Sequence, residues 1–232
     1  MHANRIFLCL ISLTLLFSSC SCHVSASGTT STQSHAFIDE LTFLGDSTTA
    51  HMQQRSALRT EQIWATQARY LNLDPRITYA RIVAPDTGCE ETIAEVAARL
   101  KPKYLVITLG IDYGVYYYRD RPDLLCFYYE KLLDAVKAAS PNTVIVMQSI
   151  FPVARGCTAI TNEMIGRANT ALASLAAARG IFFADQTATL ADEAGYLRPE
   201  YCYSADGIHL TAKAYEAILS HLKALESEIK KQ

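Results

Sequence analysis

A serine, an aspartate and a histidine have the spacing and surroundings that nucleophilic catalysis requires. Ser47 follows the apolar pair Phe43–Leu44 and the pair Gly45–Asp46. A strand that stops at a tight glycine turn and restarts as a helix presents its first side chain at the edge of a sheet, beside the free N–H groups of the helix. Ser47 is therefore a candidate nucleophile, although the same residues could also form an ordinary helix N-cap.

A second stretch, far along the chain, supplies a candidate base. Asp206 and His209 lie three positions apart, shortly before Thr211, a residue type that favours the start of a helix. At this spacing one turn of chain can hold the carboxylate against one imidazole nitrogen, which leaves the other nitrogen free to accept the Ser47 proton. A lone Asp-x-x-His is more often a surface turn, and its combination with Ser47 is what favours catalysis.

The apolar pattern around these residues predicts strands and helices in alternation. We expect strands near 41–44, 79–84, 104–109, 143–147 and 181–184, and helices near 48–55, 93–100, 123–139, 161–179 and after 211. The segment between about 56 and 78 is irregular and receives no element. This order predicts a parallel sheet of five strands covered by helices on both faces. Sites in such folds lie at the carboxyl ends of the strands.

Four short blocks along the chain resemble those of the SGNH (GDSL-type) hydrolases. The blocks are Gly45–Ser47, Thr87–Gly88, Leu109–Asp112 and Asp206–His209. Their order, spacing and placement at strand ends agree with that family, and Thr48 in place of the family's leucine is a common variation. The resemblance implies a flavodoxin-like three-layer α/β/α sandwich and serine-dependent hydrolysis of esters.

The resemblance also implies a role for each site residue. Ser47 would attack, His209 would carry the proton and Asp206 would orient the imidazole, while the oxyanion hole would consist of the Ser47 N–H, the Gly88 N–H and the side chain at position 112. Asp112 stands where the family has asparagine, and an ionised aspartate cannot donate a hydrogen bond. A negative charge about 4 Å from a developing oxyanion costs on the order of 4 kcal/mol at an effective dielectric constant of 20.

Two functions are compatible with this pattern. The first is an exported esterase that hydrolyses small acyl esters, acetyl esters above all, through an acyl-serine intermediate, with acetylated glycans as a reasonable target. The sequence has no long apolar lid, and the tyrosine-rich stretch Tyr113–Tyr118 does not favour a long-chain lipid. The alternative is a carbohydrate-binding or cell-wall-binding module that has lost catalysis, and Asp112 is its support.

Residues 1–22 resemble an export signal of the lipoprotein type. Arg5 gives a charged start, the run Ile6–Phe17 is apolar but short, and small residues lead to Cys20. We expect a lipid on Cys20 that anchors the protein to a bacterial membrane, with cleavage after Val24–Ala26 as the alternative. Residues 23–36 are rich in Ser and Thr and predict a disordered tether, followed by a hydrolase domain over residues 37–232.

Composition sets limits on the domain count and on the partners. With 232 residues, half of them apolar, the chain suits one domain with a sizeable core. Without Arg5, 20 basic residues face 23 acidic residues, and this formal charge of −3 disfavours nucleic acid as a partner.

Four cysteines follow the leader, at positions 89, 126, 157 and 202. Outside the cytoplasm they could form two disulfides in three possible pairings, of which Cys157 with Cys202 is favoured because their loops should converge. Free thiols are the alternative. No pair has CxxC spacing, so we expect no metal ion, and no motif calls for a cofactor.

Overall fold

The computed structural model describes residues 37–232, so the predicted leader, Cys20 and the tether over residues 23–36 lie outside the described part. Its main sheet has five strands in the order β2-β1-β5-β6-β7, and every neighbouring pair is parallel. The strands are β1 Leu41–Gly45, β2 Ile63–Trp64, β5 Tyr104–Thr108, β6 Val144–Gln148 and β7 Phe182–Ala184. In chain order this is 2-1-3-4-5, the flavodoxin-like order, which confirms the predicted fold class.

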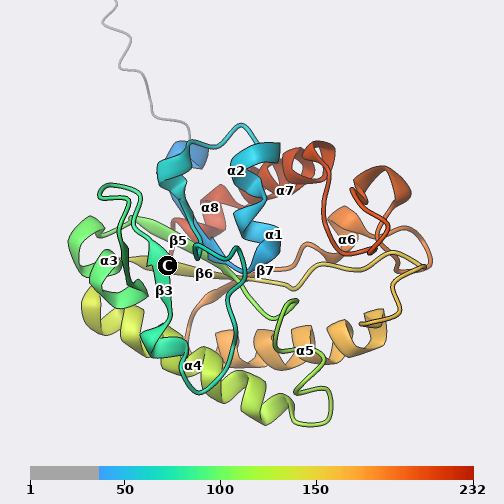
Figure 1. Cartoon of the computed structure of the whole chain (residues 1–232), viewed down its shortest axis with the longest axis horizontal. Helices are drawn as coiled ribbons and strands as arrows, with labels where there is room; N and C mark the ends of the chain where they lie inside the picture. The colour runs from blue at the N-terminus through green and yellow to red at the C-terminus, as the bar shows by residue number, and fades with distance from the viewer. Residues whose placement is uncertain (1–36) are drawn as a thin grey trace, which may run out of the picture. The chain divides into compact units, whose positions relative to one another are not determined.

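Helices cover both faces of the sheet (Figure 1). One face packs against α3 Ile93–Leu100, α4 Pro122–Ala139 and α5 Asn162–Ala178, and the other against α1 Ser47–Ala50, α2 Met52–Arg55, α7 Ala212–Ala224 and α8 Glu226–Ile229. Strand side chains alternate between the two cores, so that Leu105 and Ile107 belong to the first core and Val106 to the second. Shorter elements are α6 Thr187–Leu190, η1 Phe37–Glu40, η2 Thr60–Gln62, η3 Ile77–Tyr79 and η4 Pro199–Tyr201.

The expected strand over 79–84 does not belong to the main sheet. Arg81–Val83 forms β3, which pairs antiparallel with β4, Glu90–Thr92, in a separate two-stranded sheet. Of the three β3 residues Ile82 is the buried one, as suits a hairpin with one face toward solvent. The fifth parallel strand is instead β2, inside the segment where no element was expected, because two buried residues are too few to produce a periodic pattern.

The expected helices are present, with one division. The helix predicted over 48–55 is divided at His51 into α1 and α2. Side chains cap two of the longer helices: Thr161 accepts from the N–H of Met164 at the start of α5, and Thr211 accepts from the N–H of Ala214 at the start of α7, as the sequence indicates for Thr211. Within residues 37–232, no helix combines the length and the hydropathy that crossing a membrane requires.

The four cysteines of the described part are free thiols, so the favoured pairing of Cys157 with Cys202 is wrong for this structure. Cys157 packs against the core that contains α4 and α5, whereas Cys202 packs against the core that contains α7. The Cys202 Sγ lies 3.2 Å from the carbonyl oxygen of Ser204.

Candidate active site

The turn between β1 and α1 places Ser47 at the carboxyl edge of the sheet. Gly45 is the last residue of β1 and pairs in register with Thr108, so β1 and β5 end together. A Cβ atom on Gly45 would lie 2.1 Å from the Thr49 Oγ1 and 2.4 Å from the Thr108 carbonyl oxygen, which no side chain can tolerate. The glycine therefore allows the end of β1 to pack closely against both β5 and α1, of which Ser47 is the first residue.

The structure brings together the three residues that the sequence predicts for a Ser-His-Asp arrangement. The His209 Nε2 lies 3.2 Å from the Ser47 Oγ, and the His209 Nδ1 lies 2.7 Å from Asp206 Oδ2. Although burial acts to raise the pKa of Asp206, hydrogen bonds from the Ile208 N–H and from His209 outweigh it and hold this pKa well below its usual range. Asp206 is thus ionised and can stabilise an imidazolium at His209.

Backbone hydrogen bonds hold the Asp206–His209 turn in place. The Tyr203 N–H donates to the carbonyl oxygen of His209 at 2.7 Å, and the Ala154 N–H donates to that of Gly207 at 2.8 Å. Gly207 has a φ of +75°, a left-handed conformation that favours glycine. The imidazole therefore projects from a turn that is tied to the loop after β6 as well as to its own flanking residues.

Both carboxyl oxygens of Asp112 contact Ser47. Asp112 Oδ2 accepts from the Ser47 N–H at 2.9 Å, and Asp112 Oδ1 lies 2.6 Å from the Ser47 Oγ. Burial raises the pKa of Asp112, against the opposing effects of the Ser47 hydrogen bonds and of the nearby His209. Position 112 therefore reaches the nucleophile, as the sequence predicts, and its carboxyl group lies beside the N–H that would bind an oxyanion.

Asp46, the residue before Ser47, lies in the turn of the nucleophile and interacts electrostatically with the carboxyl group of Asp112. Asp46 is fully buried, and its Oδ2 accepts from the N–H groups of Gly110 and Ile111, each at 3.0 Å, while its Oδ1 accepts from the Thr48 hydroxyl at 3.0 Å. Burial raises the pKa of Asp46, and the negative charge of Asp112 raises it further. Two carboxyl groups that share one dry site favour a state in which one of them is neutral.

Gly88 lies in the turn between β3 and β4 and does not offer a free N–H. Its N–H donates to the carbonyl oxygen of Ala84 at 2.8 Å, and its φ is +70°. A role as an oxyanion donor would require this hydrogen bond to break. Of the three donors expected for the oxyanion hole, the structure therefore brings the Ser47 N–H and the side chain of Asp112 together and leaves Gly88 engaged in its own turn.

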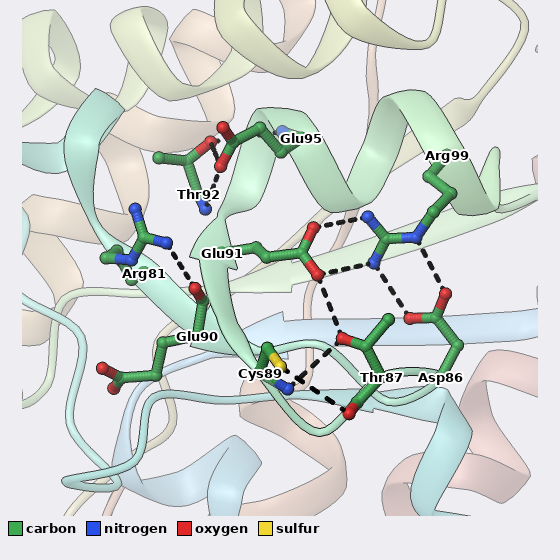
Figure 2. Close-up of polar contacts among 9 residues, drawn as sticks. All are labelled: Arg81, Asp86, Thr87, Cys89, Glu90, Glu91, Thr92, Glu95 and Arg99. Atoms are coloured by element: carbon green, nitrogen blue, oxygen red, sulfur yellow. Dashed lines mark hydrogen bonds and ion pairs between the residues drawn. The ribbon is translucent and has the colours of Figure 1, made fainter.

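The side chain of Arg99 in α3 binds residues on both sides of this turn (Figure 2). Its guanidinium donates to Asp86 at 2.8 and 3.0 Å and to both carboxylate oxygens of Glu91, while the Thr87 hydroxyl donates to Glu91 at 3.0 Å. Asp86 precedes Gly88 and Glu91 follows it, so one side chain fixes the turn at its two ends. This bidentate geometry is specific to arginine, and a lysine could not reproduce it.

Sequence reasoning missed two residues that border the site. His51, one helical turn after Ser47, has its ring centroid 4.5 Å from that of His209. Burial, followed by the positive charges of His209, Arg55 and Arg69, lowers the pKa of His51 to about 4, so this imidazole is neutral near pH 7. Arg55 donates to the carbonyl oxygen of Leu210 at 3.2 Å. The spacing of His51 and Arg55 from Ser47, in steps of four along one helical stretch, could have indicated both residues.

Comparison with known protein families identifies the chain. The sequence model of the GDSL-like Lipase/Acylhydrolase family matches residues 43–217, a span that holds Ser47, Asp206 and His209. This chain belongs to the GDSL-like lipase/acylhydrolase family. Membership confirms the resemblance drawn from the four sequence blocks, and it makes the protein an ester hydrolase by class.

Solved structures share the fold of this GDSL-family chain. A Streptococcus pneumonia protein named for platelet activating factor matches with a TM-score of 0.57 and 20% identity, over 81% of this chain and 83% of that chain. A GDSL-like lipase from Bacteroides thetaiotaomicron VPI-5482 matches with a TM-score of 0.55 and 16% identity, over 82% and 89%. No curated protein matches the sequence. At 20% and 16% identity, the structural likeness supports the fold alone and does not define a substrate or a reaction.

Proposed function

We propose that this protein hydrolyses short-chain acyl esters, acetyl esters in particular, through a covalent acyl-serine intermediate. The observation that carries the proposal is the chain of contacts from Asp206 through His209 to the Ser47 Oγ, at 2.7 and 3.2 Å. In the acylation step the Ser47 Oγ attacks the ester carbonyl and its proton passes to the His209 Nε2. Collapse of the tetrahedral intermediate expels the alcohol, which takes that proton, and water then releases the acid by the same route in reverse.

Asp112 is assigned to the oxyanion side of this mechanism. A neutral Asp112 carboxyl can donate its proton toward the Ser47 Oγ or toward the developing oxyanion, beside the Ser47 N–H. An ionised Asp112 can only accept, and it would then hold the hydroxyl proton of Ser47 away from His209. We therefore assign catalytic competence to the form in which Asp112 is neutral.

A short acyl group and a polar alcohol suit the surroundings of the nucleophile. A pocket of about 360 Å³ lies beside α1, and its walls include the side chains of Gln53, Thr66 and Gln67. Amide and hydroxyl groups would be left without partners by a long alkyl chain, whereas they can bond the hydroxyl groups of a glycan. Export and a lipid on Cys20 belong to the same proposal and rest on the sequence of residues 1–22.

The release of p-nitrophenol from its acetate ester tests the proposal. Ser47→Ala and His209→Ala should each remove nearly all of the activity, and the double variant should be little worse than either, because members of one catalytic unit are strongly non-additive. Ser174→Ala, on the exposed side of α5, is the matched control and should keep full activity.

Activity that survives Ser47→Ala would overturn the assignment of the nucleophile. The alternative, a carbohydrate-binding or cell-wall-binding module without catalysis, would be supported if the wild type releases neither p-nitrophenol from its acetate ester nor acetate from acetylated glycans, with Ser47→Ala as the blank.

A further inference from the structure

The pocket beside α1, here called the β2 pocket, opens where the main sheet ends on the β2 side. Ala50, in the same helix as Ser47, and Gly88 both contribute to its wall. The register pairs Leu44 of β1 with Trp64 of β2, so the two strands end side by side, about 5 Å apart. The β2 pocket therefore borders the helix that begins at Ser47, and its volume of about 360 Å³ is far larger than an acetyl group needs.

The charge of the β2 pocket is positive. Arg69 is the one charged residue among those lining it in the described part of the chain, and the polar side chains around it, Gln53, Thr66 and Gln67, are neutral. Within residues 37–232 Arg69 forms no salt bridge. In the same range eight arginines pair with a carboxylate, at positions 59, 76, 99, 119, 121, 155, 167 and 179, while those at positions 55, 81 and 198 likewise form no salt bridge.

Arg69 has an amide partner, and it has no carboxylate partner in the described part of the chain. The Gln54 amide lies 3.1 and 3.3 Å from the two terminal nitrogens of Arg69, and it accepts from both in the amide orientation that satisfies the two side chains. The backbone of Arg69 has a φ of +61°, a left-handed conformation that is uncommon for a residue with a Cβ atom. An amide partner orients the guanidinium, whereas a carboxylate would have cancelled its charge.

The field of Arg69 reaches His51, which borders the catalytic histidine. The positive charge of Arg69 contributes to lowering the pKa of His51, and the His51 ring lies against that of His209. A second guanidinium without a carboxylate partner in the described range, that of Arg55, stacks 3.4 Å from the ring centroid of Tyr203 beside the same site. The carboxyl groups nearest to the reacting atoms, Asp206 and Asp112, are already engaged by His209 and Ser47.

We propose that the β2 pocket binds the alcohol part of the substrate, and that this part carries a carboxylate or another oxyanion that Arg69 recognises. The planar fork of a guanidinium matches an oxyanion through two parallel hydrogen bonds, and the neutral amide and hydroxyl groups beside it suit sugar-type hydroxyls. Arg69 is then a specificity-determining residue. This inference rests on the proposed ester hydrolysis, and it narrows the substrate class to acyl esters of acidic, hydroxyl-bearing alcohols.

Two acetyl esters of nearly equal shape test the inference. The wild type should hydrolyse 4-acetoxybenzoate with a higher kcat/KM than the neutral 4-acetoxybenzamide, after correction for their spontaneous hydrolysis. Arg69→Gln should lower this ratio about ten-fold, an effect of about 1.4 kcal/mol. Arg69→Lys should keep only part of the preference, because it keeps the charge and loses the two parallel hydrogen bonds. Arg167→Gln, on the outer surface of α5, should leave both rates unchanged. Added salt should weaken the preference because the pocket is open to solvent.

An equal kcat/KM for the two esters in the wild type, or a preference that persists in Arg69→Gln, would overturn the inference while leaving ester hydrolysis intact. Binding gives an answer that does not depend on turnover. Ser47→Ala protein should bind 4-acetoxybenzoate more tightly than 4-acetoxybenzamide in ligand-observed NMR titrations, and the added substitution Arg69→Gln should remove the difference. Equal binding of both compounds would sink the proposal even if the protein proved to have no esterase activity.

Discussion

The carboxyl group of Asp112 contacts both the hydroxyl that would attack the ester and the N–H that would stabilise the oxyanion. Ser47 has a single hydroxyl proton, and the contact to Asp112, at 2.6 Å, is shorter than the contact to His209, at 3.2 Å. An ionised Asp112 takes that proton, and Ser47 cannot then pass it to His209. A neutral Asp112 can donate to the Ser47 Oγ, which frees the hydroxyl proton for the base.

Activity should therefore fall as the pH rises through the pKa of Asp112. Burial raises this pKa above the value of about 3.9 for a free aspartate, so the neutral, competent form persists at a higher pH than usual and is lost above it. Asp112→Asn keeps a hydrogen-bond donor at every pH. We therefore expect this substitution to abolish the fall in activity at high pH, here called the falling limb of the pH profile, and to raise kcat at high pH about ten-fold or more. The pH dependence of kcat with p-nitrophenyl acetate measures both effects.

Asp120→Asn, at an exposed carboxylate that pairs with Arg119, is the matched control for the change of charge. If Asp112→Asn alters neither the rate nor the pH profile, position 112 has no part in the oxyanion hole.

Asp46 should shift the same limb without touching the substrate. The negative charge of Asp112 raises the pKa of Asp46, and the repulsion between two ionised carboxylates is mutual, so Asp46→Asn should lower the pKa of Asp112 and move the falling limb to lower pH. The asparagine can keep the backbone bonds of Asp46, with its oxygen accepting from Gly110 and Ile111 and its amide donating to the Thr48 hydroxyl. A limb that stays at the same pH, in a variant with an unchanged melting temperature, would show that the two carboxyl groups are not coupled.

The turn from β1 to α1 is the element that positions the nucleophile, and its close packing makes it intolerant of change. Gly45→Ala would place a methyl group against a backbone oxygen that cannot move aside, so we expect a loss of about 3 kcal/mol in the free energy of unfolding. Gly166→Ala is the matched control, because Gly166 lies inside α5 with no atom within 4 Å of an added Cβ, and should gain about 0.5–1 kcal/mol. Urea unfolding of both variants gives the two values, and equal effects would contradict the close approach at Gly45.

The elements that sequence reasoning identified are those with a repeated pattern. Helix α4 has an apolar stripe over several turns, and the run of β5 ends at a glycine, so both were predictable. Strand β2 has two residues and no pattern, and the β3–β4 hairpin looked like another parallel strand until its partner was known. Ser47, Asp206 and His209 could be found because their motifs are local, whereas Arg69 lines the β2 pocket from a loop that has no sequence signature.

Both helix layers hold the active-site edge of the sheet. From one layer the Tyr215 hydroxyl of α7 donates to the carbonyl oxygen of Thr48 at 2.6 Å, and from the other the Tyr129 hydroxyl of α4 donates to that of Ile107 at 3.1 Å. Both tyrosine side chains are buried, so these hydrogen bonds are shielded from water. The nucleophile turn and the end of β5 are thus fixed by the same contacts that close the two cores.

We predict that the protein acts at a membrane surface, and the lipidation of Cys20 tests this prediction. Small residues and a cysteine follow the short apolar run of the leader, so we expect a lipid on the Cys20 thiol in a bacterial cell that processes lipoproteins. Cys20→Ala should move the protein from the membrane fraction to the soluble fraction, and Cys22→Ala, two positions away, is the matched control that should stay with the membrane. Mass spectrometry of the wild-type protein should show a lipidated N-terminal cysteine. An unmodified N-terminus near Ser27 would instead favour cleavage after Val24–Ala26 and a secreted enzyme. That result would leave the proposed chemistry at Ser47 unaffected, because the anchor and the active site are separate features of the chain.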